Sequence, residues 1–284
     1  MTDTSGNLLL VHIKKNRFIS LAKGINATAL QFLDKNMIFF AIANSQRKVD
    51  IYNSQGNKIE SLEGHKTAVF RIECNFLKEQ FFSVSKDQLI LWDLKTFTKI
   101  KALTPKHANT IVEAFFSKDA QGLTTVFNDS TAYEWNLNSF DLRAEIKFPE
   151  YCTAYTQSSF NKFYFAGGKN DRLISIDLAG AQYQDFWLPF HCKKILQTQT
   201  LSRENKLSFL TDDNHVSIVD FDRSGSVVAR VGCQGKAIVS YQIDAYNKNL
   251  LFITQDGQMH LYDLKSLYEY VIADQKQRIK AGEP

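Results

Sequence analysis

One stretch decides the fold: Gly64-His65-Lys66-Thr67-Ala68-Val69-Phe70, followed by Ser85-Lys86-Asp87 and Leu91-Trp92-Asp93. Apolar and polar side chains alternate over residues 68–73, as they do in a half-buried strand. Residues 81–85, 89–93 and 98–103 are further short strand patterns, and the polar residues between them favour turns. The stretch therefore predicts a unit of four short antiparallel strands.

The end of this unit recurs along the chain about every forty residues. The recurring pairs are Tyr52-Asn53, Trp92-Asp93, Trp135-Asn136, Ile176-Asp177, Val219-Asp220 and Tyr262-Asp263, at intervals of 40, 43, 41, 43 and 43 residues. Four strands per unit, opened by Gly-His and closed by Trp-Asp, are typical of the blades of a WD40 β-propeller. The predicted fold class is therefore all-β.

The number of blades follows from how the units fill the chain. Six units extend from residue 24 to about residue 272, and residues 7–22 resemble the third and fourth strands of a unit before them. We therefore predict a propeller domain over residues 1–272, on a seven-blade plan with an incomplete first blade. A six-blade propeller with an N-terminal hairpin is the alternative. No ten-residue stretch has a convincing helical pattern, and the polar residues 273–284 are predicted to form a linker.

Composition narrows the classes of partner. The 34 basic and 30 acidic residues leave a net charge of +4, which argues against a nucleic-acid partner. No apolar run is long enough to span a membrane, and the polar start is not a secretory signal. The four cysteines lie far apart, which indicates reduced thiols. We therefore expect a cytoplasmic protein with no membrane partner.

Four side chains of the deciding stretch form a candidate structural tetrad: His65, Ser85, Asp87 and Trp92. A serine, a histidine and an acid also suggest a catalytic triad, but no Gly-x-Ser-x-Gly turn presents a nucleophile here. Buried polar groups need partners, so a closed set of hydrogen bonds would stiffen the blade. We expect His65 to bridge Ser85 and Asp87, and Ser85 to accept the Trp92 N–H. This predicts a structural role and no enzyme.

The most aromatic loop region of the chain lies at residues 185–194. Large aromatic groups beside basic side chains are favoured at protein interfaces. The predicted protein-binding residues are Trp187, Phe190, His191, Lys193 and Lys194. Packing between blades is the alternative role for the same side chains.

Repeat-related cysteines do not predict a metal site. Cys152, Cys192 and Cys233 are separated by 40 and 41 residues, so they fall on different blades. A zinc ion needs three or four ligands that converge on one point. We therefore predict no metal and no cofactor.

The deciding stretch has a more specific resemblance, together with Ala166-Gly167-Gly168-Lys169 and Gln255-Asp256-Gly257. It resembles the WD-repeat half of TBC-domain proteins of centrosomes and ciliary bases, the TBC domain family member 31 type. That resemblance implies a scaffold in a larger cytoskeletal protein of the centriole, basal body or centriolar satellites, and no catalysis by this chain. Asn53, Asn136 and His12 replace the usual aspartate and depart from the repeat pattern.

The function that these observations predict is a non-catalytic scaffold for protein–protein interaction, with centriolar, basal-body or ciliary proteins as partners. The alternative is a nucleic-acid-binding WD40 domain, which only the net charge supports. The incomplete first blade would leave strand edges open and would allow weak self-association.

Overall fold

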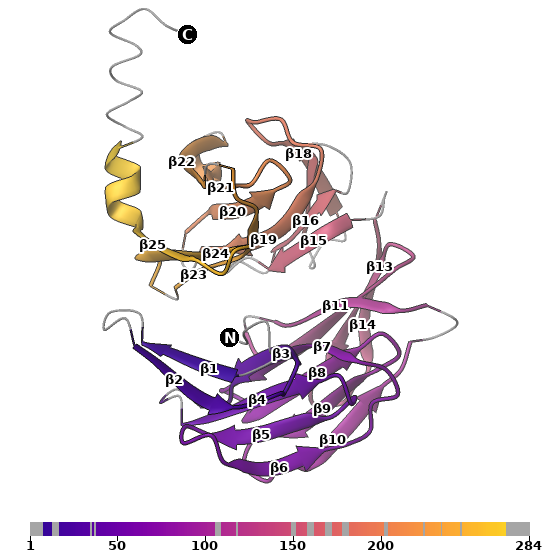
Figure 1. Ribbon diagram of the computed structural model, residues 1–284. Helices are drawn as coiled ribbons and strands as arrows, with labels where there is room; N and C mark the ends of the chain where they lie inside the picture. Colours follow the sequence, from indigo (N-terminus) through magenta and orange to yellow (C-terminus); the bar gives the residue numbers. More distant parts are fainter. Residues whose placement is uncertain are drawn as a thin grey trace, which may run out of the picture. The chain divides into compact units, whose positions relative to one another are not determined.

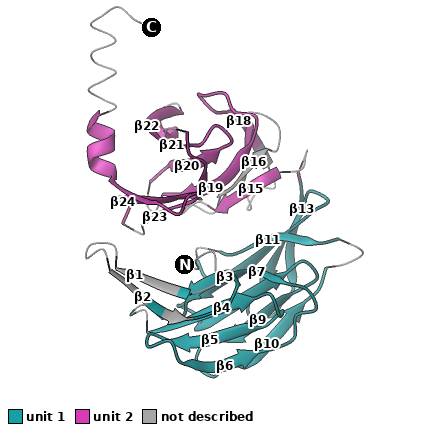
Figure 2. Ribbon diagram, in the orientation of Figure 1, with its two compact units in different colours: residues 1–147 teal, residues 148–284 magenta. Residues whose placement is uncertain are grey.

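The computed structural model describes most of the chain, and its strands lie where the repeats predict them (Figure 1). The described residues are 8–12, 17–34, 36, 38–105, 109–117, 119–148, 152–157, 162–167, 172–177, 182–201, 204–223, 225–233, 235–244 and 246–270. The predicted linker at residues 273–284 lies outside them. The chain forms two compact units, residues 1–147 and 148–284, which are described separately here (Figure 2).

Unit 1 contains a hairpin and three four-stranded antiparallel sheets. The hairpin pairs β1 (Leu8–His12) with β2 (Arg17–Ala22). The sheets consist of β3 (Ala27–Phe32), β4 (Phe39–Asn44), β5 (Val49–Asn53) and β6 (Lys58–Leu62); β7 (Val69–Asn75), β8 (Gln80–Ser85), β9 (Leu89–Asp93) and β10 (Lys99–Leu103); and β11 (Ile111–Phe116), β12 (Gly122–Phe127), β13 (Thr131–Asn136) and β14 (Leu142–Lys147).

Unit 2 contains two four-stranded sheets and one three-stranded sheet. The four-stranded sheets consist of β15 (Cys152–Gln157), β16 (Lys162–Gly167), β17 (Arg172–Asp177) and β18 (Gln182–Trp187); and β19 (Ile195–Thr200), β20 (Lys206–Thr211), β21 (His215–Asp220) and β22 (Ser226–Gly232). A short 3-10 helix, η2 (Phe221–Arg223), follows β21. The last sheet has β23 (Ile238–Ile243), β24 (Asn249–Thr254) and β25 (Met259–Asp263).

The recurring acid or amide has a local structural cause. In each sheet it is the last residue of the third strand, at positions 53, 93, 136, 177, 220 and 263. The Asp93 side chain accepts hydrogen bonds from the backbone of Lys95 and Thr96, at 2.9 and 2.8 Å. Asn53 accepts the backbone N–H groups of Gln55 and Asn57 in the same way. Since an amide oxygen starts this turn as well as a carboxylate does, asparagine can replace aspartate.

The hydrophobic core lies between successive sheets within each unit. Adjacent residues of a second strand point to opposite faces, so one strand serves two interfaces. Phe81 of β8 packs with residues of the first sheet, whereas Phe82 packs toward β11 and β12. Phe209 and Leu210 of β20 divide in the same way. The aromatic content of the chain thus fills the spaces between blades, as large flat side chains can.

The last repeat differs from its prediction. Instead of a fourth strand, a helix occupies residues 264–270. Asp263 caps its first turn by accepting the Ser266 N–H at 2.8 Å, and Leu264, Leu267 and Tyr268 pack on the core of unit 2. Apolar side chains at positions i, i+3 and i+4 after an acidic cap are a helical pattern that is too short to stand out in a ten-residue search. No helix in the described part of the chain is long and apolar enough to cross a membrane.

Five sheets therefore have the four strands of a complete blade among the described residues. The predicted six complete units are corrected to five, and neither the seven-blade plan nor the six-blade alternative is confirmed. The predicted N-terminal hairpin is present. Leu8 of β1 is buried with Phe40, Ile42 and Tyr52, so the hairpin packs against the first complete sheet of unit 1.

Candidate functional site

The predicted tetrad residues meet in one chain of hydrogen bonds in the β7–β10 sheet. His65 Nδ1 lies 2.8 Å from Ser85 Oγ, and Ser85 Oγ donates to Asp87 Oδ1 at 2.8 Å. The other ring nitrogen, Nε2, lies 2.6 Å from Ser83 Oγ. Trp92 Nε1 donates to Ser83 Oγ at 2.8 Å. The expected contacts were wrong in two respects, because Ser83 and not Ser85 receives the indole N–H, and because His65 bridges Ser85 and Ser83 and not Ser85 and Asp87.

One arrangement of protons satisfies this chain. Ser85 gives its only proton to Asp87, so it accepts the N–H of His65 Nδ1. Burial lowers the pKa of His65 to about 4, against the opposing effect of Asp87. The ring is therefore neutral at pH 7, and its bare Nε2 accepts the Ser83 hydroxyl proton. Every polar group has a partner, which rigidifies the blade.

The loop that enters β7 is shaped around this chain. Gly64 has φ of +138°, and a Cβ there would lie 3.1 Å from Ile90, so glycine is required. Its carbonyl accepts the side-chain amide of Gln88. Burial alone would raise the pKa of Asp87, but hydrogen bonds from Thr67 and Ser85 bring it below its usual value.

This cluster is closed to a substrate. Ser83 and Ser85 are fully buried, and both hydroxyls are engaged in the hydrogen bonds described above. A serine nucleophile must present its oxygen to the substrate and to an adjacent base. Chemically, the arrangement can only hold the loop before β7, the strands β8 and β9 and the turn between them together.

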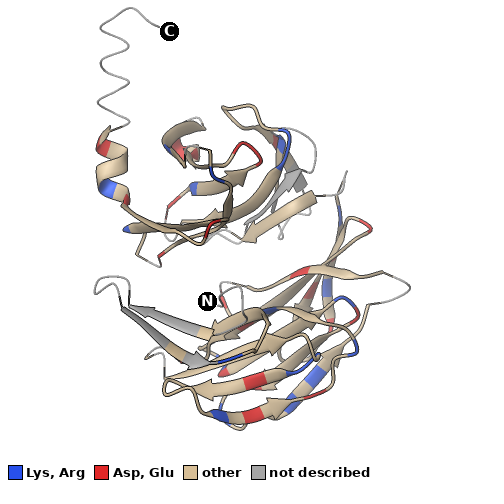
Figure 3. Ribbon diagram, viewed as in Figure 1, with Lys and Arg blue, Asp and Glu red and all other residues tan. Residues whose placement is uncertain are grey.

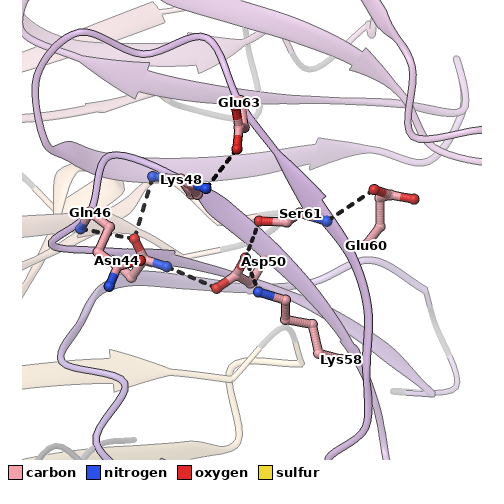
Figure 4. Close-up of polar contacts among 8 residues, drawn as sticks. All are labelled: Asn44, Gln46, Lys48, Asp50, Lys58, Glu60, Ser61 and Glu63. Carbon is pink, nitrogen blue, oxygen red and sulfur yellow. Dashed lines mark hydrogen bonds and ion pairs between the residues drawn. The ribbon is translucent and has the colours of Figure 1, made fainter.

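The first sheet of unit 1 uses a different polar cluster, centred on Asp50 of β5 (Figure 4). Asp50 is buried, and it accepts a hydrogen bond from Asn44 Nδ2 at 2.8 Å. Ser61 Oγ and Lys58 Nζ donate to its other oxygen at 2.6 and 3.1 Å. A buried carboxylate with three donors therefore joins β4, β5 and β6.

The predicted protein-binding residues surround the passage from β18 to β19 in unit 2. Trp187 is the last residue of β18, and 68% of its surface is exposed. His191, Lys193 and Lys194 are also exposed. We call the four exposed residues the Trp187 surface. Basic and acidic residues are otherwise interspersed over both units (Figure 3).

Phe190 has a different place from the other four. It is only 9% exposed and packs edge-on against Phe209, with ring centroids 6.3 Å apart. The Arg230 guanidinium lies over its other side, 5.3 Å from the ring centroid. For Phe190 the alternative role, packing between sheets, therefore holds.

Three further residues belong to this region, although the sequence pattern did not predict a role for them: Asp212, Asp213 and Arg230. Asp212 Oδ1 accepts the backbone N–H groups of Lys193 and Lys194, both at 3.1 Å. Asp213 pairs with Arg230. The acidic pair Asp212-Asp213 after β20 is the sequence signal for these contacts. The backbone of the loop is thus fixed at Lys193 and Lys194, whose side chains are exposed.

The cysteines are dispersed in the structure. Cys152 is buried, and Cys74, Cys192 and Cys233 are half-buried free thiols. Burial raises the pKa of the Cys74 thiol to about 12, so this sulfur stays protonated. Within the described ranges, no three His, Cys, Asp or Glu residues are grouped in a way that could hold a metal ion.

Comparison with known proteins finds similarity over nearly the whole chain. TBC1 domain family member 31 of Xenopus tropicalis is 22% identical over 279 residues, which cover 93% of this chain and 26% of the relative. The Homo sapiens protein of the same name is 20% identical over 283 residues, 95% of this chain and 26% of the relative. The chain thus spans about a quarter of the length of these relatives. The resemblance that the motifs predicted is confirmed. No family model matches the chain.

A solved structure supports the fold. A chain of the "Crystal Structure of Mitotic Checkpoint Complex" superposes with a TM-score of 0.76 at 14% identity, over 90% of this chain and 81% of that one. At this identity the likeness concerns the fold alone. The predicted all-β, β-propeller fold is confirmed.

Proposed function

We propose that this chain is a non-catalytic protein-interaction scaffold within a larger protein, and that it docks that protein at the centriole, the basal body or centriolar satellites. The similarity to TBC1 domain family member 31 over 93% of the chain supports the scaffold role. The location rests on the resemblance of the motifs to the WD-repeat half of centrosomal TBC-domain proteins.

One observation supports the proposal: an exposed tryptophan at the end of β18 is followed by a loop that is fixed by packing and hydrogen bonds. Trp187 is 68% exposed, and the following loop is fixed by the Phe190 ring and by the Asp212 carboxylate. A preorganised loop loses little conformational entropy on binding. Tryptophan is among the residues that contribute most to interfaces when a partner covers them. The Trp187 surface is therefore the proposed docking site.

The test is the location of the full-length protein in cells that carry Trp187→Ala together with Lys193→Ala and Lys194→Ala. We expect recruitment to the basal body to fall strongly while the melting temperature of the domain stays unchanged. Proximity labelling with the wild type and with this variant would identify the partners that are lost. Normal recruitment of the folded variant would remove this site.

The matched control is Lys66→Ala together with Lys99→Ala. Both lysines are exposed, and they belong to unit 1, whereas the Trp187 surface belongs to unit 2. This control should keep recruitment. Equal loss in both variants would show that total charge, and not this surface, governs recruitment.

A further inference from the structure

The first strand of each of the six larger sheets has a register shift, as at a β-bulge, beside its second residue. At that point the register with the following strand shifts in β3, β7, β11, β15, β19 and β23. A bulge sets two residues against one and redirects a side chain. In β19 and β23 the redirected residues are Leu196 and Val239, which are 43% and 64% exposed. Bulges thus present two apolar side chains to solvent in unit 2.

These two side chains lie at the start of neighbouring strands. Gln197 Nε2 donates to the Tyr241 carbonyl at 3.0 Å, and the Tyr241 N–H donates to Gln197 Oε1 at 3.4 Å. The amide of Gln197 therefore joins β19 to β23 one residue beyond Leu196. Leu196 and Val239 stand on these two neighbouring strands, and we call the two residues the bulge ledge.

The Trp187 surface connects with the bulge ledge along the loop. β15 lies beside β19, since Thr153 Oγ1 donates to the Ile195 carbonyl at 2.9 Å. β18 is at the other edge of the β15 sheet, three strands away. Strands in a sheet are about 4.8 Å apart, so the three steps from β18 to β15 cover about 14 Å, and one further step of similar size to β19 brings the path from Trp187 to Leu196 to about 19 Å. An exposed apolar group stands at each end of this path.

Positive charge lies between the two ends. Lys193 and Lys194 are exposed, and neither forms an ion pair with an acidic residue in the described part of the chain. The nearby carboxylates are already engaged: Asp212 accepts the backbone of these two lysines, and Asp213 pairs with Arg230. Two cations are therefore left for the carboxylates of a partner.

We propose that the path from Trp187 to the bulge ledge binds an extended acidic peptide with an apolar residue at each end. An extended chain advances about 3.3 Å per residue, so apolar residues about six positions apart would reach both ends. Glutamates or aspartates between them would face Lys193 and Lys194. This inference rests on the proposed function and names the chemistry of its partner.

A short synthetic peptide tests the inference on the whole chain. The probe is a fluorescein-labelled peptide of sequence Leu-Glu-Glu-Asp-Glu-Glu-Phe, and binding is followed by fluorescence anisotropy at low and high salt. We expect Lys193→Glu with Lys194→Glu, and separately Leu196→Asn, each to weaken binding by about tenfold. The control Lys99→Glu with Lys147→Glu makes the same change in charge on β10 and β14, and should leave the affinity unchanged.

Three results would overturn the inference. The first is equal binding of a charge-reversed Leu-Lys-Lys-Lys-Lys-Lys-Phe peptide, and the second is loss of binding in the control to the same extent. The third is tight binding of a single-stranded RNA oligonucleotide that the Lys193 and Lys194 changes abolish while the acidic peptide stays unbound. If recruitment in cells depends on Trp187 but the acidic peptide does not bind, this inference fails and the proposed function stands. If recruitment is normal without Trp187, both fail.

Discussion

The loop entering β7 and the loop entering β19 occupy the same position in their sheets, yet they are held in opposite ways. In the first, the polar side chain of His65 points inward, where Ser83 and Ser85 satisfy both ring nitrogens. In the second, the backbone is satisfied by Asp212, and the lysine side chains remain outside. In the first loop the polar side chain is therefore buried in the fold, whereas in the second loop the backbone is fixed and the lysine side chains stay exposed.

The difference shows how a repeat acquires a binding surface. Both loops are ordered by a hydrogen-bond acceptor from the same sheet, Ser85 in one and Asp212 in the other. When the acceptor binds a side chain, that side chain is engaged within the fold and is not available to a partner. When it binds the backbone, the side chains become available to a partner. Four experiments, three mutational and one with pH, test this contrast.

The largest effect on stability is expected at Phe190, which anchors the loop entering β19. Phe190→Ala should lower the free energy of unfolding by about 3 kcal/mol, because it leaves a cavity beside Phe209. Chemical denaturation measures this value. The exposed neighbour Lys193→Ala should change it by less than about 0.5 kcal/mol. Equal stability of both variants would mean that Phe190 is not an anchor.

Replacing His65 in the loop entering β7 should lower stability nearly as much. His65→Ala leaves Ser83 and Ser85 without their shared partner and should cost about 1–3 kcal/mol. Thermal unfolding would record a lower melting temperature, whereas Lys66→Ala beside it should have little effect. Peptide binding by the folded His65→Ala protein should be retained. Loss of binding with unchanged stability would contradict a structural role.

A smaller effect is expected from pH. The pKa of His65 is about 4 in the folded chain and about 6.5 in an unfolded one, so only the unfolded state takes up a proton between these values. The contribution of His65 is therefore complete above pH 6.5 and is lost as the pH falls toward 4. Denaturation at several pH values should show the stability gap between wild type and His65→Ala shrinking over this window. A gap that widens in acid would refute the neutral, buried ring.

The smallest effect on stability should come from the Trp187 surface. Trp187→Ala should change the free energy of unfolding by less than about 0.5 kcal/mol, since the side chain is 68% exposed. Trp92→Ala, which removes a buried tryptophan, is the contrasting variant and should be strongly destabilising. Comparing the two by denaturation tests whether the tryptophans divide into surface and core. Similar losses would place Trp187 in the core.

Much of the fold was predictable because its signals are local. An acid or amide that ends a strand starts the next turn with its own side chain, as Asp93 does, and it repeats in every sheet. The last repeat broke the pattern, since Asp263 caps a helix and not a strand-to-strand turn. Both outcomes use the same side-chain oxygen, so the pattern alone does not separate them.

The sequence by itself determined the period, the strands and the residues that meet around His65, because alternation and turn chemistry depend on near neighbours. Only the tertiary structure decided that Ser83 receives the Trp92 N–H, that Phe190 is buried under Arg230, and that Lys193 and Lys194 keep free side chains. Each of these outcomes depends on an atom from another strand or turn. The distance and orientation of that atom are set by packing, which a periodic pattern does not contain.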